Sequence, residues 1–273
     1  MKRRAPHAKK RYGQHFLHDP GIIDRIVRAI DPRPGDRIVE VGPGRGAITA
    51  PVLGRVGAID VVEIDRDVVP LLRSHCDGRG ELRVHVADAL EFDFRALRGA
   101  GPPLRLIGNL PYNVSTPLLF HFIGQLDAFD DMHFMLQREV VARMAAQPDT
   151  EDYGRLTVTL APHVTVEPLF DIGTGAFQPP PQVVSTFFAL RPHAAPPFDA
   201  GDPAAYARVV AAAFSKRRKT LRNALAGLLT PEQILAAGVD PGARAETLSP
   251  ERFGALARQR GRAVPPERTD AQG

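Results

Sequence analysis

Short apolar runs that alternate with amphipathic segments constrain the fold of this chain more than any other feature of its sequence. Runs of this kind are typical of buried strands, and the amphipathic segments between them of helices. The alternation predicts an α/β fold with a doubly wound, mostly parallel, Rossmann-like sheet. Two later runs are predicted to bring the sheet to seven strands and to pair antiparallel at one edge. The seven runs are 37–41, 59–64, 82–86, 104–107, 132–136, 156–166 and 183–190.

Helix signals flank this region. Asp19 followed by Pro20 predicts the start of an amphipathic helix that ends at Ile30. Beyond a proline-rich linker at 191–197 the strand signals stop, and three cap-plus-proline helix starts predict a small all-α domain. The expected division is a basic arm over 1–18, an α/β domain over 19–191, a helical domain over 197–260 and a disordered tail over 261–273.

Composition excludes several classes of protein. The chain has 273 residues, of which 44% are hydrophobic, so it is not a disordered or fibrous protein. Its single cysteine, Cys76, excludes a disulfide framework and a cysteine-rich zinc site. The basic N-terminus is followed by no apolar signal region, and no apolar run approaches the ~18 residues of a membrane span. We expect a cytoplasmic protein with no membrane attachment and no metal.

Basic residues are concentrated at two places. Residues 1–11 contain six Lys and Arg and no acid, residues 216–222 contain five more, and the rest of the chain is mildly acidic. This pattern favours a polyanionic partner, most simply nucleic acid, although basic runs of this size also serve solubility alone. The candidate RNA contacts are Lys9, Lys10, Arg11, Lys216, Arg217, Arg218, Lys219 and Arg222.

A glycine-rich turn follows the first predicted strand of the sheet. Gly42, Gly44 and Gly46 would let the backbone approach a ligand closely. Their spacing departs from the pyrophosphate fingerprint, so the turn alone is compatible with a plain tight connection. Glu63 ends the second strand, where an acid can accept both hydroxyls of a ribose, and Asp88 follows the third, where it could accept from an adenine amine. A single acid at a strand end is more often a helix cap, but the three together favour an adenosyl cofactor.

The fourth strand ends in Asn109-Leu110-Pro111-Tyr112. The Asn109 side-chain oxygen and the Leu110 carbonyl can accept both hydrogens of an exocyclic amine, which orients the nitrogen lone pair outward. Tyr112 can stack on the base that carries this amine. Most tetrapeptides of this kind are simply turns with a packed tyrosine, but a position at the carboxyl end of a sheet strand favours a ligand site.

This arrangement resembles the class I S-adenosylmethionine methyltransferases, in which Asn-Leu-Pro-Tyr is the motif for N6-methylation of adenine. More closely, residues 9–260 resemble the KsgA/RsmA family of small-subunit ribosomal RNA adenine dimethyltransferases. The matching segments are 12–17, 108–117, 137–141, 153–156, 177–181 and 214–223.

The resemblance implies that S-adenosyl-L-methionine is the cofactor. It places the cofactor contacts at His15, Leu17, Gly42, Gly44, Glu63, Asp88 and Asn109. His15 is a departure, because the family usually has asparagine there, but one ring nitrogen can still form a hydrogen bond. Gln182 and Val184 replace Lys and Asp that are frequent in the family, which puts RNA contacts from that loop in doubt. Phe177 is either a second aromatic residue that stacks on the base or a core side chain.

The implied activity is methylation of N6 on two adjacent adenosines in the 3′-terminal hairpin loop of small-subunit ribosomal RNA, giving N6,N6-dimethyladenosine late in assembly. The implied partner is the immature small ribosomal subunit, and a monomer is the family default. Two alternatives stay open: a large-subunit RNA adenine methyltransferase of the macrolide-resistance type, and a non-catalytic assembly or transcription factor on the same scaffold. An NAD-dependent oxidoreductase would explain neither the tetrapeptide nor the basic segments.

Overall fold

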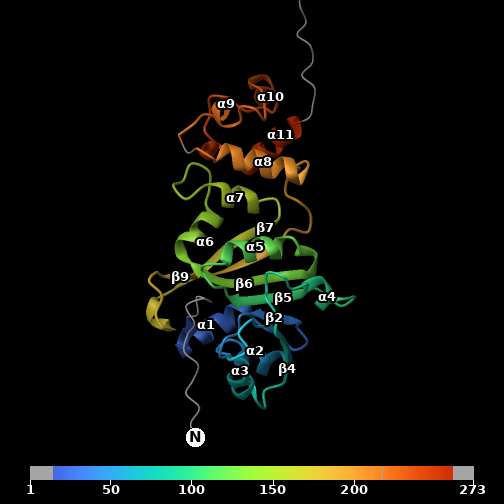
Figure 1. Cartoon of the computed structure of the whole chain (residues 1–273), viewed down its shortest axis with the longest axis vertical. Coiled ribbons are helices and arrows are strands. Elements are labelled where there is room, and N and C mark those ends of the chain that lie inside the picture. Colours follow the sequence, from blue (N-terminus) through green and yellow to red (C-terminus); the bar gives the residue numbers. More distant parts are fainter. Residues whose placement is uncertain (1–14, 217, 261–273) are drawn as a thin grey trace, which may run out of the picture. The chain divides into compact units, whose positions relative to one another are not determined.

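The computed structural model describes residues 15–216 and 218–260 (Figure 1). The chain divides into two compact units. One is formed by the chain up to residue 142 together with residues 165–192, and the other by residues 143–164 together with the chain from residue 193 onward. The sequence predicts a single domain boundary between residues 191 and 197. In the structure the second unit also includes the earlier segment 143–164.

A seven-stranded sheet is the centre of the first unit, with the strand order β4-β3-β2-β5-β6-β9-β7. The strands β2 to β6 pair in parallel, and β9 runs antiparallel to β6. The mostly parallel sheet predicted from the sequence is thereby confirmed. The strands are β2 Ile38–Val41, β3 Ala58–Val62, β4 Glu81–His85, β5 Leu104–Asn109, β6 Phe129–Gln137, β7 Val164–Ile172 and β9 Ser185–Pro192.

The strand order reverses at β2. The chain proceeds from β2 through β3 to β4 on one side, and then returns so that β5 pairs with the other side of β2. Val41, the last residue of β2, is opposite Val62 of β3 and Gly108 of β5. The carboxyl ends of these three strands therefore lie together. In open α/β sheets this reversal is where ligands bind.

One face of the sheet packs against the helices α1 Pro20–Ile30, α2 Thr49–Val56 and α3 Val69–Cys76. Ile38, Ile107, Met135 and Phe187 point to this face and share one hydrophobic core with the three helices. As predicted, α1 begins at Asp19, whose carboxylate accepts a hydrogen bond from the Ile22 amide.

The opposite face carries aromatic side chains, because neighbouring residues of a strand alternate between faces. Phe134 of β6 and Phe188 of β9 point this way, with ring centroids 6.2 Å apart. The helices α4 Phe94–Arg98 and α5 Ser115–Ile123 cover them, with α5 lying over β6 (Figure 1). Phe122 of α5 stacks on Phe134 at 5.4 Å, and Phe94 meets Phe122 edge-on at 5.6 Å. These contacts fix α5, which begins just after the predicted tetrapeptide.

Helices make up the second unit. At the three predicted cap-plus-proline starts, the side chains of Asp202 and Thr230 cap α8 Pro203–Ala213 and α10 Pro231–Ala236, whereas Ser249 precedes α11 Pro250–Gln259 without a side-chain cap. The Tyr206 hydroxyl donates to the Val158 carbonyl at 2.8 Å inside their shared core. Of the helices in the described chain, none is long and apolar enough to span a membrane. The helices are α6 Arg138–Ala145, which spans the unit boundary, α7 Arg155–Leu160, α8 Pro203–Ala213, α9 Leu221–Ala224, α10 Pro231–Ala236 and α11 Pro250–Gln259.

The strand predicted over 156–166 is wrong in its first half, because residues 155–160 form the helix α7 and the strand β7 begins only at Val164. The β-branched residues that suggested a strand are accommodated by hydrogen bonds to backbone carbonyls. The Thr157 hydroxyl donates to the Arg143 carbonyl and the Thr159 hydroxyl to the Arg155 carbonyl. Tertiary packing of Val158 then outweighs the local strand propensity.

The basic segment 216–222 does not form one helix. The helix α8 ends at Ala213, and the described residues up to Thr220 form turns and bends. The Leu221 amide donates to the Ala243 carbonyl and the Arg222 amide to the Pro241 carbonyl. Because these amides bond to a distant segment rather than to the preceding turn, no continuous helix can run through the basic segment.

Candidate functional site

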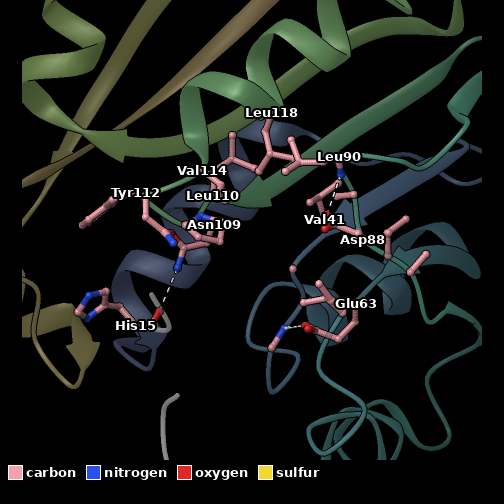
Figure 2. A pocket seen from close by; sticks show the side chains of 18 of the residues that line it. His15, Val41, Glu63, Asp88, Leu90, Asn109, Leu110, Tyr112, Val114 and Leu118 are labelled. Atoms are coloured by element: carbon pink, nitrogen blue, oxygen red, sulfur yellow. Dashed lines mark hydrogen bonds between the residues drawn. The ribbon is translucent and has the colours of Figure 1, made fainter. Parts of the chain in front are cut away.

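A pocket of about 270 Å³ opens at the carboxyl ends of the parallel strands. Figure 2 shows Glu63 and Asp88 on one side of it and His15, Asn109 and Tyr112 on the other. The pocket brings together most of the cofactor-binding and catalytic residues predicted from the sequence. Those that line it are His15, Gly42, Gly44, Glu63, Asp88, Asn109, Leu110, Pro111 and Tyr112.

The glycine-rich turn lies against the N-terminal segment. Gly42 and Gly44 have φ values of 66° and 52°, in the left-handed region that favours glycine. A Cβ on Gly44 would lie 3.1 Å from the ring of Phe16, a tight contact that the ring would have to relieve by shifting. Phe16 belongs to the short strand β1 Phe16–Leu17. The Arg45 guanidinium lies over the Phe16 ring, 4.3 Å from the ring centroid.

Glu63 is anchored by two backbone amides. One carboxylate oxygen accepts from the Asp65 amide at 2.8 Å and the other from the Gly44 amide at 3.3 Å. Glu63 is only 5% exposed, and burial raises its pKa although both amide hydrogen bonds oppose the rise. The carboxylate is therefore held in one orientation at the pocket wall, with lone pairs left to accept from a ligand.

A second acid, Glu40, lies beneath the glycine-rich turn and is absent from the sequence prediction. Its carboxylate accepts from the Thr49 hydroxyl at 2.5 Å. Burial raises the pKa of Glu40 to about 7, and the nearby charge of Glu63 adds to the rise. A small cavity under the turn is lined by Glu40 together with His15 and Asn109. The available signal was an acid in the middle of an otherwise apolar strand.

Asp88 follows β4 and lines the pocket beside Leu90. One of its carboxylate oxygens accepts from the Leu90 amide at 2.9 Å, which leaves the other oxygen available to a ligand. In the ranges 15–216 and 218–260, no group of three or more His, Cys, Asp and Glu side chains could hold a metal ion.

Asn109 ends β5 with its amide already oriented. Its side-chain nitrogen donates to the His15 carbonyl at 3.0 Å, so its side-chain oxygen is left as an acceptor (Figure 2). Gly108 makes this position possible, because a Cβ there would lie 2.6 Å from the Val41 carbonyl oxygen. The close approach of β5 to β2 thus brings Asn109 next to the glycine-rich turn.

Tyr112 is held at both its hydroxyl and its ring. The hydroxyl lies 2.6 Å from the Ser185 hydroxyl, and the ring stacks on His15 with centroids 5.8 Å apart. Burial raises the pKa of Tyr112, against the effect of the Ser185 hydrogen bond. The His15 ring also bonds to the Pro179 carbonyl at 2.8 Å. Sequence reasoning missed both Ser185 and Pro179.

Two of the residues predicted to contact the cofactor or the base do not line the pocket. Leu17 and Phe177 belong to an antiparallel pair formed by β1 with β8 Phe177–Gln178. Both are buried in the hydrophobic core, and Phe177 is 2% exposed. A base could stack on Phe177 only if this pair moved, so the burial supports the alternative that Phe177 is a core side chain.

The predicted RNA contacts are only partly visible. Lys9, Lys10, Arg11 and Arg217 lie outside the described residues. Those that are described are all exposed and belong to the second unit: Lys216, Arg218, Lys219 and Arg222.

Comparison with known proteins adds to this geometry. A family model described as "Ribosomal RNA adenine dimethylase" matches residues 5–259. A relative from Nitrosococcus oceani, named "Ribosomal RNA small subunit methyltransferase A", is 52% identical over 254 residues, which cover 92% of this chain and 95% of the relative. A relative of the same name from Pseudomonas aeruginosa is 51% identical over 252 residues, with 92% and 94% covered.

Solved structures are also similar. A dimethyladenosine transferase from Plasmodium falciparum is 25% identical, with a TM-score of 0.74 over 89% of this chain and 96% of that chain. The 23S rRNA methyltransferase ErmE is 24% identical, with a TM-score of 0.70 over 90% of this chain and 100% of that chain. At that identity the second likeness concerns the fold alone.

Proposed function

Because the chain belongs to the ribosomal RNA adenine dimethylase family, we propose that it methylates N6 of two adjacent adenosines in the 3′-terminal hairpin loop of small-subunit ribosomal RNA. Its relatives over nine-tenths of the chain are named small-subunit methyltransferases. The observation that carries the proposal is the fixed Asn109 amide, whose free oxygen is an acceptor for the amine of an adenine. The product is N6,N6-dimethyladenosine.

The pocket fits S-adenosylmethionine. Gly42 and Gly44 form a turn with positive φ values that leaves its backbone open to a ligand, and Glu63 offers a fixed carboxylate to the ribose hydroxyls. Asp88 has one free oxygen for the adenine amine. The backbone of His15 closes the wall beside Asn109. When bound, this cofactor supplies an electrophilic methyl group on a sulfonium, so the chain need supply no strong general base.

Asn109 and Leu110 orient the amine that reacts. With the Asn109 nitrogen engaged by His15, its oxygen and the Leu110 carbonyl accept the two N6 hydrogens. These bonds favour a pyramidal nitrogen with its lone pair directed at the methyl group, which is catalysis by alignment. After one methylation N6 keeps a single hydrogen, so only one of the two acceptors can stay engaged in the second transfer. Tyr112 stacks on the base.

The target base must leave its stack to reach this pocket, and loop RNA lowers the cost of that step. The two basic segments would then hold the phosphate backbone, which makes binding depend on salt. Lys216, Arg218, Lys219 and Arg222 are exposed and free to do so. The partner is the immature small ribosomal subunit, in which this loop is still unmodified.

The decisive experiment is nucleoside mass spectrometry after incubation with S-adenosylmethionine and either undermethylated small subunits or large-subunit RNA. We expect dimethyladenosine in the small-subunit sample alone. Product only in the large-subunit sample would support a resistance-type enzyme. RNA binding without product in either sample would support a non-catalytic assembly factor.

A further inference from the structure

A second and larger hollow lies in the first unit beside the glycine-rich turn. It has a volume of about 530 Å³ and is bordered by β1, α1, α2 and the end of α3. Its floor is apolar and includes Val27, Ala47 and Ala50. We call it the arginine groove, after Arg45, Arg55 and Arg79 on its walls.

The arginine groove is electropositive. Among the described residues that line it, Asp24 is the single acid, and its carboxylate already pairs with Arg28 at 2.9 Å. Arg55 and Arg79 are exposed, and neither forms an ion pair with another described residue. Arg79 uses Nε to donate to the His75 carbonyl, which leaves its terminal nitrogens free to donate elsewhere. Guanidinium groups of this kind bind phosphates through paired hydrogen bonds.

The arginine groove adjoins the candidate active site. Phe16 lines both hollows, and the small cavity beneath the glycine-rich turn is lined by both Arg45 and Asn109. The Arg45 guanidinium lies 4.3 Å from the centroid of the Phe16 ring, which fixes its place at the boundary. A strand that enters the pocket with one base can therefore lay its neighbouring backbone along the same wall.

We propose that the arginine groove binds sugar and phosphate groups of the RNA strand adjacent to the methylated nucleotide. Arg55 and Arg79 contact phosphate oxygens, and the apolar floor packs against ribose carbons. This inference rests on the proposed function, because it takes the RNA substrate as the ligand. Charge counting along the sequence did not indicate the groove, since these arginines lie far apart in the chain and converge only in the fold.

The test is the salt dependence of binding. We would measure the affinity of the full chain for undermethylated small subunits between 50 and 200 mM KCl, with an Arg55→Ala/Arg79→Ala variant. The matched control is Arg33→Ala/Arg73→Ala, which removes the same charge from exposed residues that do not line the groove. Affinity for S-adenosylmethionine, measured by calorimetry, checks that each variant is folded.

We expect the groove variant to lose affinity on the order of tenfold and to reduce the slope of log K against log salt by about 1.4, since each single-strand phosphate contact contributes about 0.7. The control should keep the wild-type slope. The proposal is overturned if the groove variant keeps the wild-type slope of log K against log salt. It is also overturned if the groove variant and the control lose the same affinity for small subunits. A wild-type chain that binds subunits but transfers no methyl group contradicts the proposed function while the slopes still decide the groove.

Discussion

The two sides of the pocket are built in different ways. On the side of Glu63 and Asp88, each carboxylate is fixed by backbone amides, and the partners of Asp88 and of one Glu63 oxygen lie two residues away. On the side of Asn109 and Tyr112, the partners are His15 and Ser185, which are 94 and 73 residues distant in the chain. The first side is made by local turns, and the second by contacts that only the complete first unit can supply.

This difference separates two tasks. A cofactor of constant shape can be held by loops whose geometry is set locally. Orienting an amine and a flat base requires side chains fixed from several directions, and long-range contacts provide that. Changes on the local side should therefore alter cofactor affinity, and changes on the long-range side should alter turnover.

The largest effect is expected from Asn109→Ala, which removes the amine acceptor. Methyl transfer should fall by about a hundredfold to a thousandfold, the cost of losing one oriented group that stabilises a transition state. Affinity for the small subunit should remain, because the role proposed for Asn109 is toward the amine of one base and not toward the phosphate backbone. Incorporation of labelled methyl groups into small subunits measures methyl transfer, and filter binding measures affinity for the small subunit. Turnover close to that of the wild type would refute the orienting role.

Glu40→Gln tests the support beneath the local side. The pKa of Glu40 rises from 4.5 to about 7 on folding, so this group favours the folded state most below pH 4.5 and loses that contribution as the pH rises to about 7. The loss amounts to at most about 3 kcal/mol. Glutamine does not titrate and can still accept from Thr49.

Relative to the wild type, the Glu40→Gln variant should therefore become more stable as the pH rises from 4.5 to 8, which means that its free energy of unfolding rises compared with that of the wild type. Urea titrations at several pH values measure it. The exposed acid Glu91, changed to Gln, is the control and should follow the wild type. Parallel profiles for Glu40→Gln and wild type would show that burial of Glu40 does not govern the pH dependence.

Glu63→Gln should weaken cofactor binding by about thirtyfold, because hydrogen bonds to a charged acceptor contribute roughly 2 kcal/mol. Turnover at saturating cofactor should change much less, which is the signature expected of the local side. Calorimetry with S-adenosylmethionine measures cofactor affinity, and a kcat determination measures turnover. The Glu91→Gln variant is again the control. An unchanged cofactor affinity would remove Glu63 from the cofactor site.

The smallest effect is expected from Ser185→Ala, which frees the Tyr112 hydroxyl. The loss of one neutral hydrogen bond, about 1 kcal/mol, should lower kcat/KM for small subunits about fivefold. The same substitution made in a Tyr112→Phe background should change nothing further. If Ser185→Ala costs the same in both backgrounds, Ser185 supports the fold of β9 rather than the position of Tyr112.

The sequence predicts the local side of the pocket well for a physical reason. Gly42 and Glu63 follow parallel strands directly and Asp88 comes three residues after one, and the carboxyl ends of such strands meet at one edge. No periodicity or spacing connects Tyr112 with Ser185, so that contact could not be predicted. The helix α7 was missed because local strand propensity is weaker than the packing that overrides it.

The contacts of His15 also set an order of events during synthesis. Its carbonyl accepts from Asn109, and its ring bonds to Pro179, 164 residues further along the chain. By Asp88 a nascent chain already contains Gly42, Gly44, Glu63 and Asp88, but it must extend to Ser185 before the Tyr112 hydroxyl can meet its partner. Loop closure over such separations is slow relative to the formation of local turns. The bonds that hold the His15 ring and the Tyr112 hydroxyl can therefore form only after Pro179 and Ser185 have been synthesised, whereas the partners of the Asp88 and Glu63 carboxylates are present much earlier.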